Sequence, residues 1–193
     1  MLIFAATFRK LIKIMANIYQ KFKKDKLKEV ILYILEKTGD ISYYQLMKIL
    51  FCSERVNLVA CGDQITDLKF KARQHGPVPN ELYSEITKAQ DGNDSDLNGI
   101  VEIMDKYTLH ALRKSNRDYL SVTDMESIDK GINELNGKTY EEVESYLHDD
   151  VYNRVMKSKR RVYSLIDIAE SGNASDSMKN YILENQSISM SLM

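Results

Sequence analysis

Apolar residues recur at helical spacing in the first quarter of the chain. Five of them follow one another at the i, i+3, i+4, i+7 and i+8 spacing of a single helix face: Leu27, Val30, Ile31, Ile34 and Leu35. Gly39 follows this stripe at the position where a helix commonly ends. The pattern predicts a helix that buries one side and stops before residue 39.

Three later segments carry the signature of a helix N-terminus. In a capping box, an N-cap Ser or Thr is followed three positions later by a residue whose side chain bonds back to the N-cap amide. The pairs are Ser42 with Gln45, Ser121 with Asp124, and Thr139 with Glu142. Gly62 and Asn136 are expected to end the first two helices. The third is expected to continue through His148 to Tyr152.

The period changes from helical to alternating after residue 67. Residues 68–73 place Leu, Phe and Ala on one side and basic residues on the other, which predicts a half-buried strand. Further strand candidates are residues 100–104, 107–112 and 118–120, the last two as a hairpin through residues 114–116. Together they predict a small antiparallel sheet. The expected fold class is α+β, a mostly helical single domain with a small antiparallel sheet.

Both prolines of the chain lie in one nine-residue stretch. It reads His75, Gly76, Pro77, Val78, Pro79, Asn80, Glu81, Leu82 and Tyr83. Proline fixes φ and lacks an amide donor, and the residue before a proline favours extended geometry. Because a strand candidate precedes the stretch and helix-compatible residues follow it, we expect a stiff corner from strand to helix.

Composition and charge limit the classes of partner. Hydrophobic residues make up 44% of the 193 residues, which is enough for one domain with its own core. The formal net charge of −1 argues against a general electrostatic nucleic-acid binder, so nucleic acid is not an expected partner. Between Arg9 and Lys28, however, eight basic residues accompany the single acid Asp25. This segment is either a solvated helix face with a leader or a basic arm that meets an acidic partner.

Cysteine usage and the N-terminal segment bear on the compartment. Cys52 and Cys61 lie nine residues apart in one predicted helix, so they point to opposite faces and cannot form a disulfide. The apolar start of the chain precedes its basic residues, which is the reverse of a secretory signal. No segment reaches the roughly 18–20 apolar residues of a membrane helix. We expect a cytoplasmic protein with no membrane partner; Met15 offers an alternative start that would make residues 1–14 an upstream extension.

Candidate chemistry is sparse. The three histidines, at positions 75, 110 and 148, lack the close spacing of a zinc site, and three adjacent residues such as His148, Asp149 and Asp150 do not share a helix face. Residues 91–102 superficially resemble a calcium loop, but Asp96 stands where such a loop needs Gly. The chain has no nucleophile elbow and no phosphate loop. We expect no catalytic residue, no metal and no cofactor.

Three stretches form an ordered set of motifs. The first, residues 46–83, contains a leucine-rich helix, a Gly-Asp-Gln-Ile-Thr loop and the segment ending in Gly-Pro-Val-Pro-x-x-Leu-Tyr. The second is residues 120–129, and the third is residues 139–152, in which Tyr152 stands where the related pattern has Trp. In this order they resemble the Panacea domain of the SocA-like antitoxins of bacteria and phages. The resemblance covers about residues 27–155.

The resemblance implies an antitoxin that neutralises a cognate toxin protein by binding it. Alternatives are a proteolytic adaptor that delivers its partner to a ClpXP-type protease and a nucleic-acid-binding regulator. The matching residues, either partner contacts or scaffold, are His75, Gly76, Pro77, Val78, Pro79, Leu82, Tyr83, His148 and Tyr152. The expected organisation is a helix-compatible extension over residues 1–20, the antitoxin domain over residues 21–186 and a frayed tail over residues 187–193.

Overall fold

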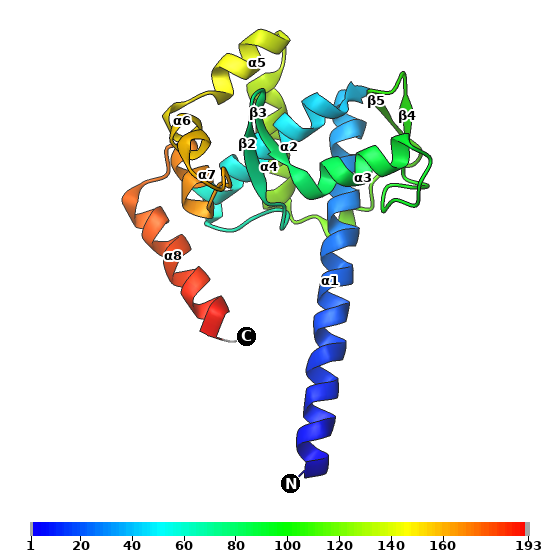
Figure 1. Cartoon of the computed structure of the whole chain (residues 1–193), viewed down its shortest axis with the longest axis vertical. Coiled ribbons are helices and arrows are strands. Elements are labelled where there is room, and N and C mark those ends of the chain that lie inside the picture. Colours follow the sequence, from blue (N-terminus) through cyan, green and yellow to red (C-terminus); the bar gives the residue numbers. More distant parts are fainter. Residues whose placement is uncertain (1, 192–193) are drawn as a thin grey trace.

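Helices dominate the computed structural model, which describes the backbone of residues 2–191 and the side chains of residues 11–188 (Figure 1). The helices are α1 (Leu2–Thr38), α2 (Tyr43–Cys61), α3 (Asn80–Gln90), α4 (Val122–Leu135), α5 (Tyr140–Leu147), α6 (Asp150–Lys157), α7 (Leu165–Ser171) and α8 (Asp176–Ser191). The strands are β1 (Ile41–Ser42), β2 (Phe70–Arg73), β3 (Gly76–Pro79), β4 (Val101–Met104) and β5 (Thr108–Ala111). A short 3₁₀ helix, η1, spans Arg117–Tyr119. The predicted α+β class, a helical domain with a small antiparallel sheet, is confirmed.

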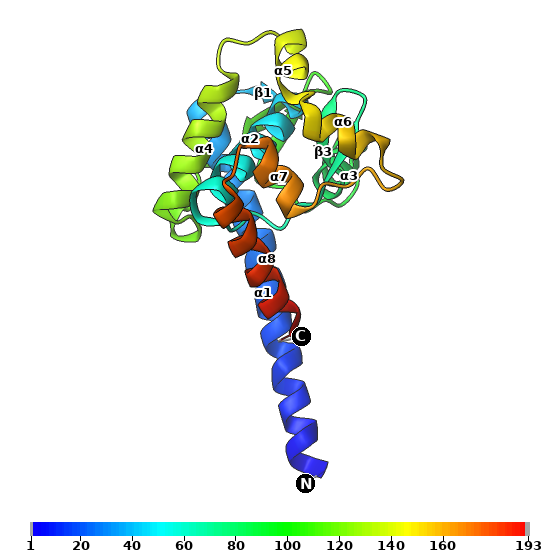
Figure 2. The same cartoon turned by 90° about the vertical axis from the view of Figure 1, so that its left-hand side faces the viewer.

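Helix α2 runs through the centre of the molecule, and α4, α7 and β3 pack against it (Figures 1 and 2). Its ends are those predicted from the sequence. The Ser42 side chain accepts from the Gln45 amide in a complete capping box, and Gly62 takes the left-handed conformation (φ 73°) at the C-cap. Cys52 is buried in the core and Cys61 is exposed, as expected from their spacing.

Helix α1 is much longer than the apolar stripe that predicts it. From Val30 to Leu35 every residue is buried, so this part of the helix is enclosed by the core on all sides. The helix ends as expected, with the Gly39 amide donating to the Leu35 carbonyl at 2.9 Å. Its N-terminal half leaves the body and points away from it (Figure 1). Within residues 2–191, no helix has both the length and the hydropathy needed to span a bilayer.

The strands form two separate sheets, and the prediction of one sheet that includes residues 68–73 is wrong. One sheet has the order β1-β5-β4, and the other is the hairpin of β2 and β3. The predicted hairpin of residues 107–112 with 118–120 is also wrong, because Asp105 and Lys106 both adopt positive φ and turn the chain between β4 and β5. Residues 117–119 instead form η1, whose N-cap is the Asn116 side chain.

The proline segment is a paired strand and not only the corner predicted from the sequence. Residues 76–79 form β3, antiparallel to β2, before α3 begins at Asn80. Pro77 and Pro79 stand opposite Ala72 and Phe70, whose backbone groups bond residues 161 and 163 on the other side of β2. Pro77 and Pro79 therefore occupy positions that do not bond β2, so their lack of an N–H group removes no hydrogen bond from the hairpin.

The helix expected from Thr139 through Tyr152 is two helices. Helix α5 begins with the predicted capping box of Thr139 and Glu142 but ends at Leu147. Asp149 then caps α6 by accepting from the Tyr152 amide at 2.7 Å. An N-cap residue has non-helical backbone angles, so Asp149 separates the two helices.

Candidate functional site

Five tyrosines from separate parts of the chain line one groove on the surface. They are Tyr43 and Tyr44 at the start of α2, Tyr83 on α3, Tyr107 in the β4–β5 turn and Tyr140 at the start of α5. We refer to this feature as the tyrosine groove. Its volume is about 680 Å³, and its other lining residues are Ser42, Met47, Lys48, Arg73, Gln74, His75 and Val78.

The tyrosine rings support one another. Tyr43 lies between Tyr83 and Tyr107, with ring centroids 6.2 and 6.0 Å away, and Tyr44 stacks on Tyr140 at 4.1 Å. Aromatic pairs at these separations attract beyond the effect of buried area alone. Tyr83, Tyr107 and Tyr140 nevertheless remain exposed to solvent. The groove therefore presents fixed aromatic faces that are free to contact a partner.

The groove is lined by basic residues and by no Asp or Glu. The Arg73 guanidinium lies 5.3 Å from the centroid of the Tyr83 ring. His75 stands edge-on to Tyr140, and its Nδ1 lies 3.0 Å from the Glu144 carboxylate, which stays outside the lining. A segment that carries negative charge would meet complementary charge in this groove.

A buried lysine lies at the bottom of the groove. Lys48 is 0% exposed, and its Nζ donates to the Pro77 carbonyl at 2.9 Å and lies 4.7 Å from the Tyr44 ring centroid. Burial lowers the pKa of Lys48 to about 7, against the opposing attraction of Glu144. Gly76 allows this approach, because a Cβ there would lie 3.2 Å from Nζ and its φ of 92° favours glycine. Lys48 thus holds β3 against α2.

Tyr152 bonds the β2–β3 turn, and His148 stacks on the Tyr152 ring. The Tyr152 hydroxyl donates to the Arg73 carbonyl at 2.9 Å, and the two rings stack with centroids 4.0 Å apart. Burial lowers the pKa of His148, which favours its neutral form. Its Nε2 is buried without a hydrogen-bond partner among the described residues. These two residues support the site and do not line it.

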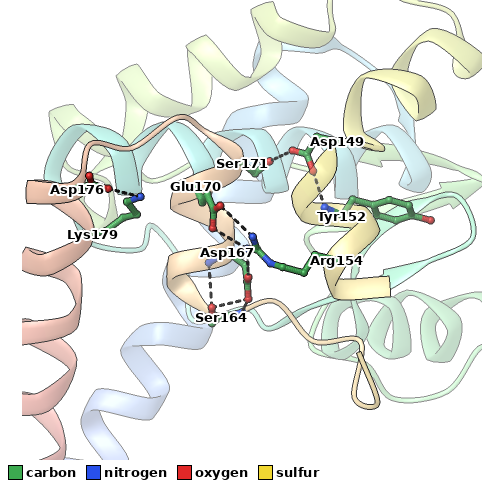
Figure 3. Close-up of polar contacts among 9 residues, drawn as sticks. All are labelled: Asp149, Tyr152, Arg154, Ser164, Asp167, Glu170, Ser171, Asp176 and Lys179. Carbon is green, nitrogen blue, oxygen red and sulfur yellow. Dashed lines mark hydrogen bonds and ion pairs between the residues drawn. The ribbon is translucent and has the colours of Figure 1, made fainter. Parts of the chain in front are cut away.

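A cluster of polar contacts fixes α6 to α7 and thereby positions Tyr152 (Figure 3). Arg154 on α6 bonds both Asp167 and Glu170 on α7, each at 2.8 Å. The Ser171 hydroxyl donates to Asp149, the residue that also caps α6. Figure 3 shows the Tyr152 ring pointing away from this cluster. The helix pair is therefore held together, and Tyr152 on α6 connects it to the β2–β3 hairpin.

The residues predicted from the sequence fall into two groups. His75, Val78 and Tyr83 line the groove. The others hold the surrounding structure: Gly76 and Pro77 contact Lys48, Pro79 is the N-cap residue of α3, Leu82 is buried in the core, and His148 and Tyr152 support the turn. The structure thus brings all nine into one region but places only three on the groove surface.

Several groove residues lie outside the motifs from which the sequence predicts site residues. Tyr107 and Tyr140 lie far from the proline segment in the chain and reach the groove only through the fold. Lys48 could have been identified, because it interrupts the apolar run Leu46-Met47-Lys48-Ile49-Leu50. A lysine in such a run is expected to be buried with a partner, as it is here.

Among the described side chains, those at the groove do not pair a nucleophile with a base. His75 and Glu144 form the one acid–base pair at its edge, and in the described part of the chain neither bonds a Ser, Thr or Cys side chain. The side chains of residues 11–188 include no group of three or more His, Cys, Asp or Glu placed to hold a metal ion. Aromatic faces, hydroxyls and positive charge are what the groove offers.

Comparison with protein families relates this region to known proteins. The family described as "Antitoxin SocA-like, Panacea domain" matches residues 46–151, just over half of the chain. The match is narrower than the resemblance over residues 27–155, and it contains Lys48, the β2–β3 hairpin and three of the five groove tyrosines. No curated protein and no solved structure matches the chain.

Proposed function

Because the chain belongs to the SocA-like antitoxin family with its Panacea domain, we propose that it neutralises a cognate toxin by binding it directly in the tyrosine groove. The family supports an antitoxin-type role, which calls for a surface that another protein can bind. The observation that carries the proposal is the groove itself, in which fixed, exposed tyrosines lie beside Arg73 with no acidic side chain in the lining.

Tyrosine suits such a surface for physical reasons. Its ring gives a large contact area for little loss of side-chain entropy, and its hydroxyl remains able to hydrogen-bond at a wet rim. Aromatic residues and arginine are enriched at the energetically important centres of interfaces. The toxin segment that fits is one with apolar side chains for the tyrosine faces and an acidic side chain near Arg73.

Within this proposal, the predicted site residues have different roles. His75, Val78 and Tyr83 contact the toxin, because they line the groove. Gly76, Pro77, Pro79, Leu82, His148 and Tyr152 are scaffold. The antitoxin domain comprises residues 21–186, and residues 1–20 are an extension to it. The partner is bound in the groove without chemistry, so no cofactor takes part.

Co-expression with the product of the adjacent gene tests the function. We expect that product alone to arrest growth, the chain to restore growth, and the two proteins to purify together. Restored growth with an unchanged half-life of the partner in a pulse-chase indicates masking, whereas a shortened half-life indicates delivery to a ClpXP-type protease. If the chain neither restores growth nor purifies together with this gene product, the antitoxin proposal is contradicted.

A further inference from the structure

The N-terminal part of α1 has few neighbours in the rest of the molecule (Figures 1 and 2). It leaves the body near Phe22, whose ring stacks on Tyr119 with centroids 5.5 Å apart. Lys23 fixes the base of the projection through an ion pair with Asp67. The helix upstream of these contacts has about 20 residues and a length of ~30 Å. We call residues 11–22, the part whose side chains are described, the arm.

The arm exposes a row of large apolar side chains. They are Leu11, Ile12, Ile14, Met15, Ile18, Tyr19 and Phe22. Met15 and Ile18 are 63% and 64% exposed. At 100° per residue, all seven fall within one arc of about 160° around the helix axis. A contiguous apolar surface of this kind on a soluble body marks a contact site.

The other face of the arm is polar and carries only positive charge. It consists of Lys13, Ala16, Asn17, Gln20 and Lys21. The first 24 residues of the chain include six basic residues and no acidic one. Among the described side chains, Lys13 and Lys21 make no ion pair, whereas Lys23 is already paired with the body. The arm therefore presents apolar surface and unpaired positive charge together.

A second copy of the chain is a poor match for this surface. Leu11, Met15, Ile18 and Phe22 have the 4-3-4 spacing of a coiled-coil seam, but the positions that flank the seam hold Ile12, Ile14, Tyr19 and Lys21. None of these is acidic, so paired arms would gain no ion pair between flanking positions. The apolar arc is also wider than the narrow seam that a two-stranded coiled coil buries.

A wide apolar arc opposite a polar face whose only charges are positive is the pattern of a helix that lies in the plane of a lipid interface. We propose that the arm binds the surface of an anionic lipid bilayer. Its apolar arc enters the boundary of the acyl chains, and Lys13 and Lys21 reach the negative headgroups. Tyr19, with the Lys23 ammonium 4.2 Å from its ring centroid, lies at the edge between the two faces. The prediction of no membrane partner rests on the lack of a spanning or secretory segment. A helix that lies on the bilayer surface is a different case and needs neither.

Co-sedimentation of the full chain with vesicles tests the proposal. We expect binding to vesicles of phosphatidylglycerol and phosphatidylcholine in equal parts, and little binding to phosphatidylcholine alone. The double substitution Met15→Gln with Ile18→Gln should weaken binding to the anionic vesicles by about tenfold or more, because two apolar side chains no longer enter the interface. Lys13→Gln with Lys21→Gln should weaken it by about tenfold through lost attraction to the headgroups.

Val122→Gln is the matched control, since this residue is 67% exposed at the start of α4 and lies outside the arm. It should bind the anionic vesicles as the unmodified chain does. Light scattering of the protein alone shows whether the arm pairs two copies. The proposal is overturned by equal binding to both kinds of vesicle, by absence of binding to the anionic vesicles, or by a dimer that Met15→Gln with Ile18→Gln dissociates while vesicle binding is absent. Binding of an acidic protein to the arm, in the absence of binding to anionic vesicles, would likewise overturn the lipid proposal.

Discussion

Lys48 shows how one buried amine can hold two elements together. Lys48 is a buried residue of α2, and its Nζ donates to the carbonyl of Pro77 on β3. A neutral amine still donates this hydrogen bond, so the contact does not require the charge that burial disfavours. Glu54, six residues further along α2, is the opposite case. Burial raises the pKa of this carboxyl to about 7, although it accepts from the Ile65 and Thr66 amides.

The lowered pKa of Lys48 makes a prediction about the pH dependence of stability. The pKa is 10.5 in the unfolded chain and about 7 in the folded protein, so the unfolded state binds more protons between these values. Stability contributed by this group therefore rises with pH through that window. Relative to Lys48→Met, the unmodified chain should gain on the order of 2 kcal/mol between pH 7 and pH 9 in urea unfolding.

The exposed lysine at position 69 provides the control for this measurement. Lys69→Met makes the same substitution at an exposed lysine, so it measures the effect of replacing lysine by methionine without burial. Lys48→Met also leaves the Pro77 carbonyl without its donor, which should cost about 1–3 kcal/mol at every pH. A pH-independent difference between Lys48→Met and the unmodified chain would show that the lysine is protonated in the folded state throughout the window.

At the scale of elements, the sequence predicts helix starts well and strand partners poorly. A capping box is complete within four residues, so Ser42, Ser121 and Thr139 each begin a helix as expected. Strand pairing depends on residues far away in the chain. Ala72 and Phe70 bond residues 161 and 163, and this distant pairing is what allows two prolines in β3.

The crossing of α2 and α4 gives a prediction about packing. A Cβ on Gly131 would lie 2.5 Å from the Ser53 Oγ and 2.7 Å from the Ser53 amide nitrogen, and backbone cannot move aside cheaply. Alanine favours helix over glycine by about 1 kcal/mol, yet overpacking should dominate. We expect Gly131→Ala to lower the free energy of unfolding by about 1–3 kcal/mol in urea titration.

A neighbouring exposed position on the same helix isolates the packing effect. Glu126→Ala should change stability by less than about 0.5 kcal/mol, as surface substitutions usually do. If Gly131→Ala proves as stable as the unmodified chain, the two helices do not approach as closely as the structure places them, and the central position of α2 would need revision.

At the scale of the whole molecule, the tyrosine groove exists only because the fold brings separate segments together. The start of α2 and the β2–β3 hairpin each contribute at least four residues, and α3, the β4–β5 turn and the start of α5 contribute one tyrosine each. The proline motif near the groove could be found in the sequence, since its residues are contiguous. Apart from Tyr83, which belongs to that motif, the tyrosines could not, because a tyrosine that packs in a core and one that lines a groove have the same local pattern.

The central claim is that the tyrosine groove holds the toxin, and a calorimetric titration of the chain with the purified product of the adjacent gene tests it most directly. Tyr83→Ser with Tyr107→Ser removes two exposed rings and should weaken binding about a hundredfold or more, as loss of aromatic contacts at an interface centre does. Tyr181→Ser removes a similarly exposed ring on α8 and should leave the affinity unchanged. Equal affinities for the unmodified chain and the groove variant would contradict the claim.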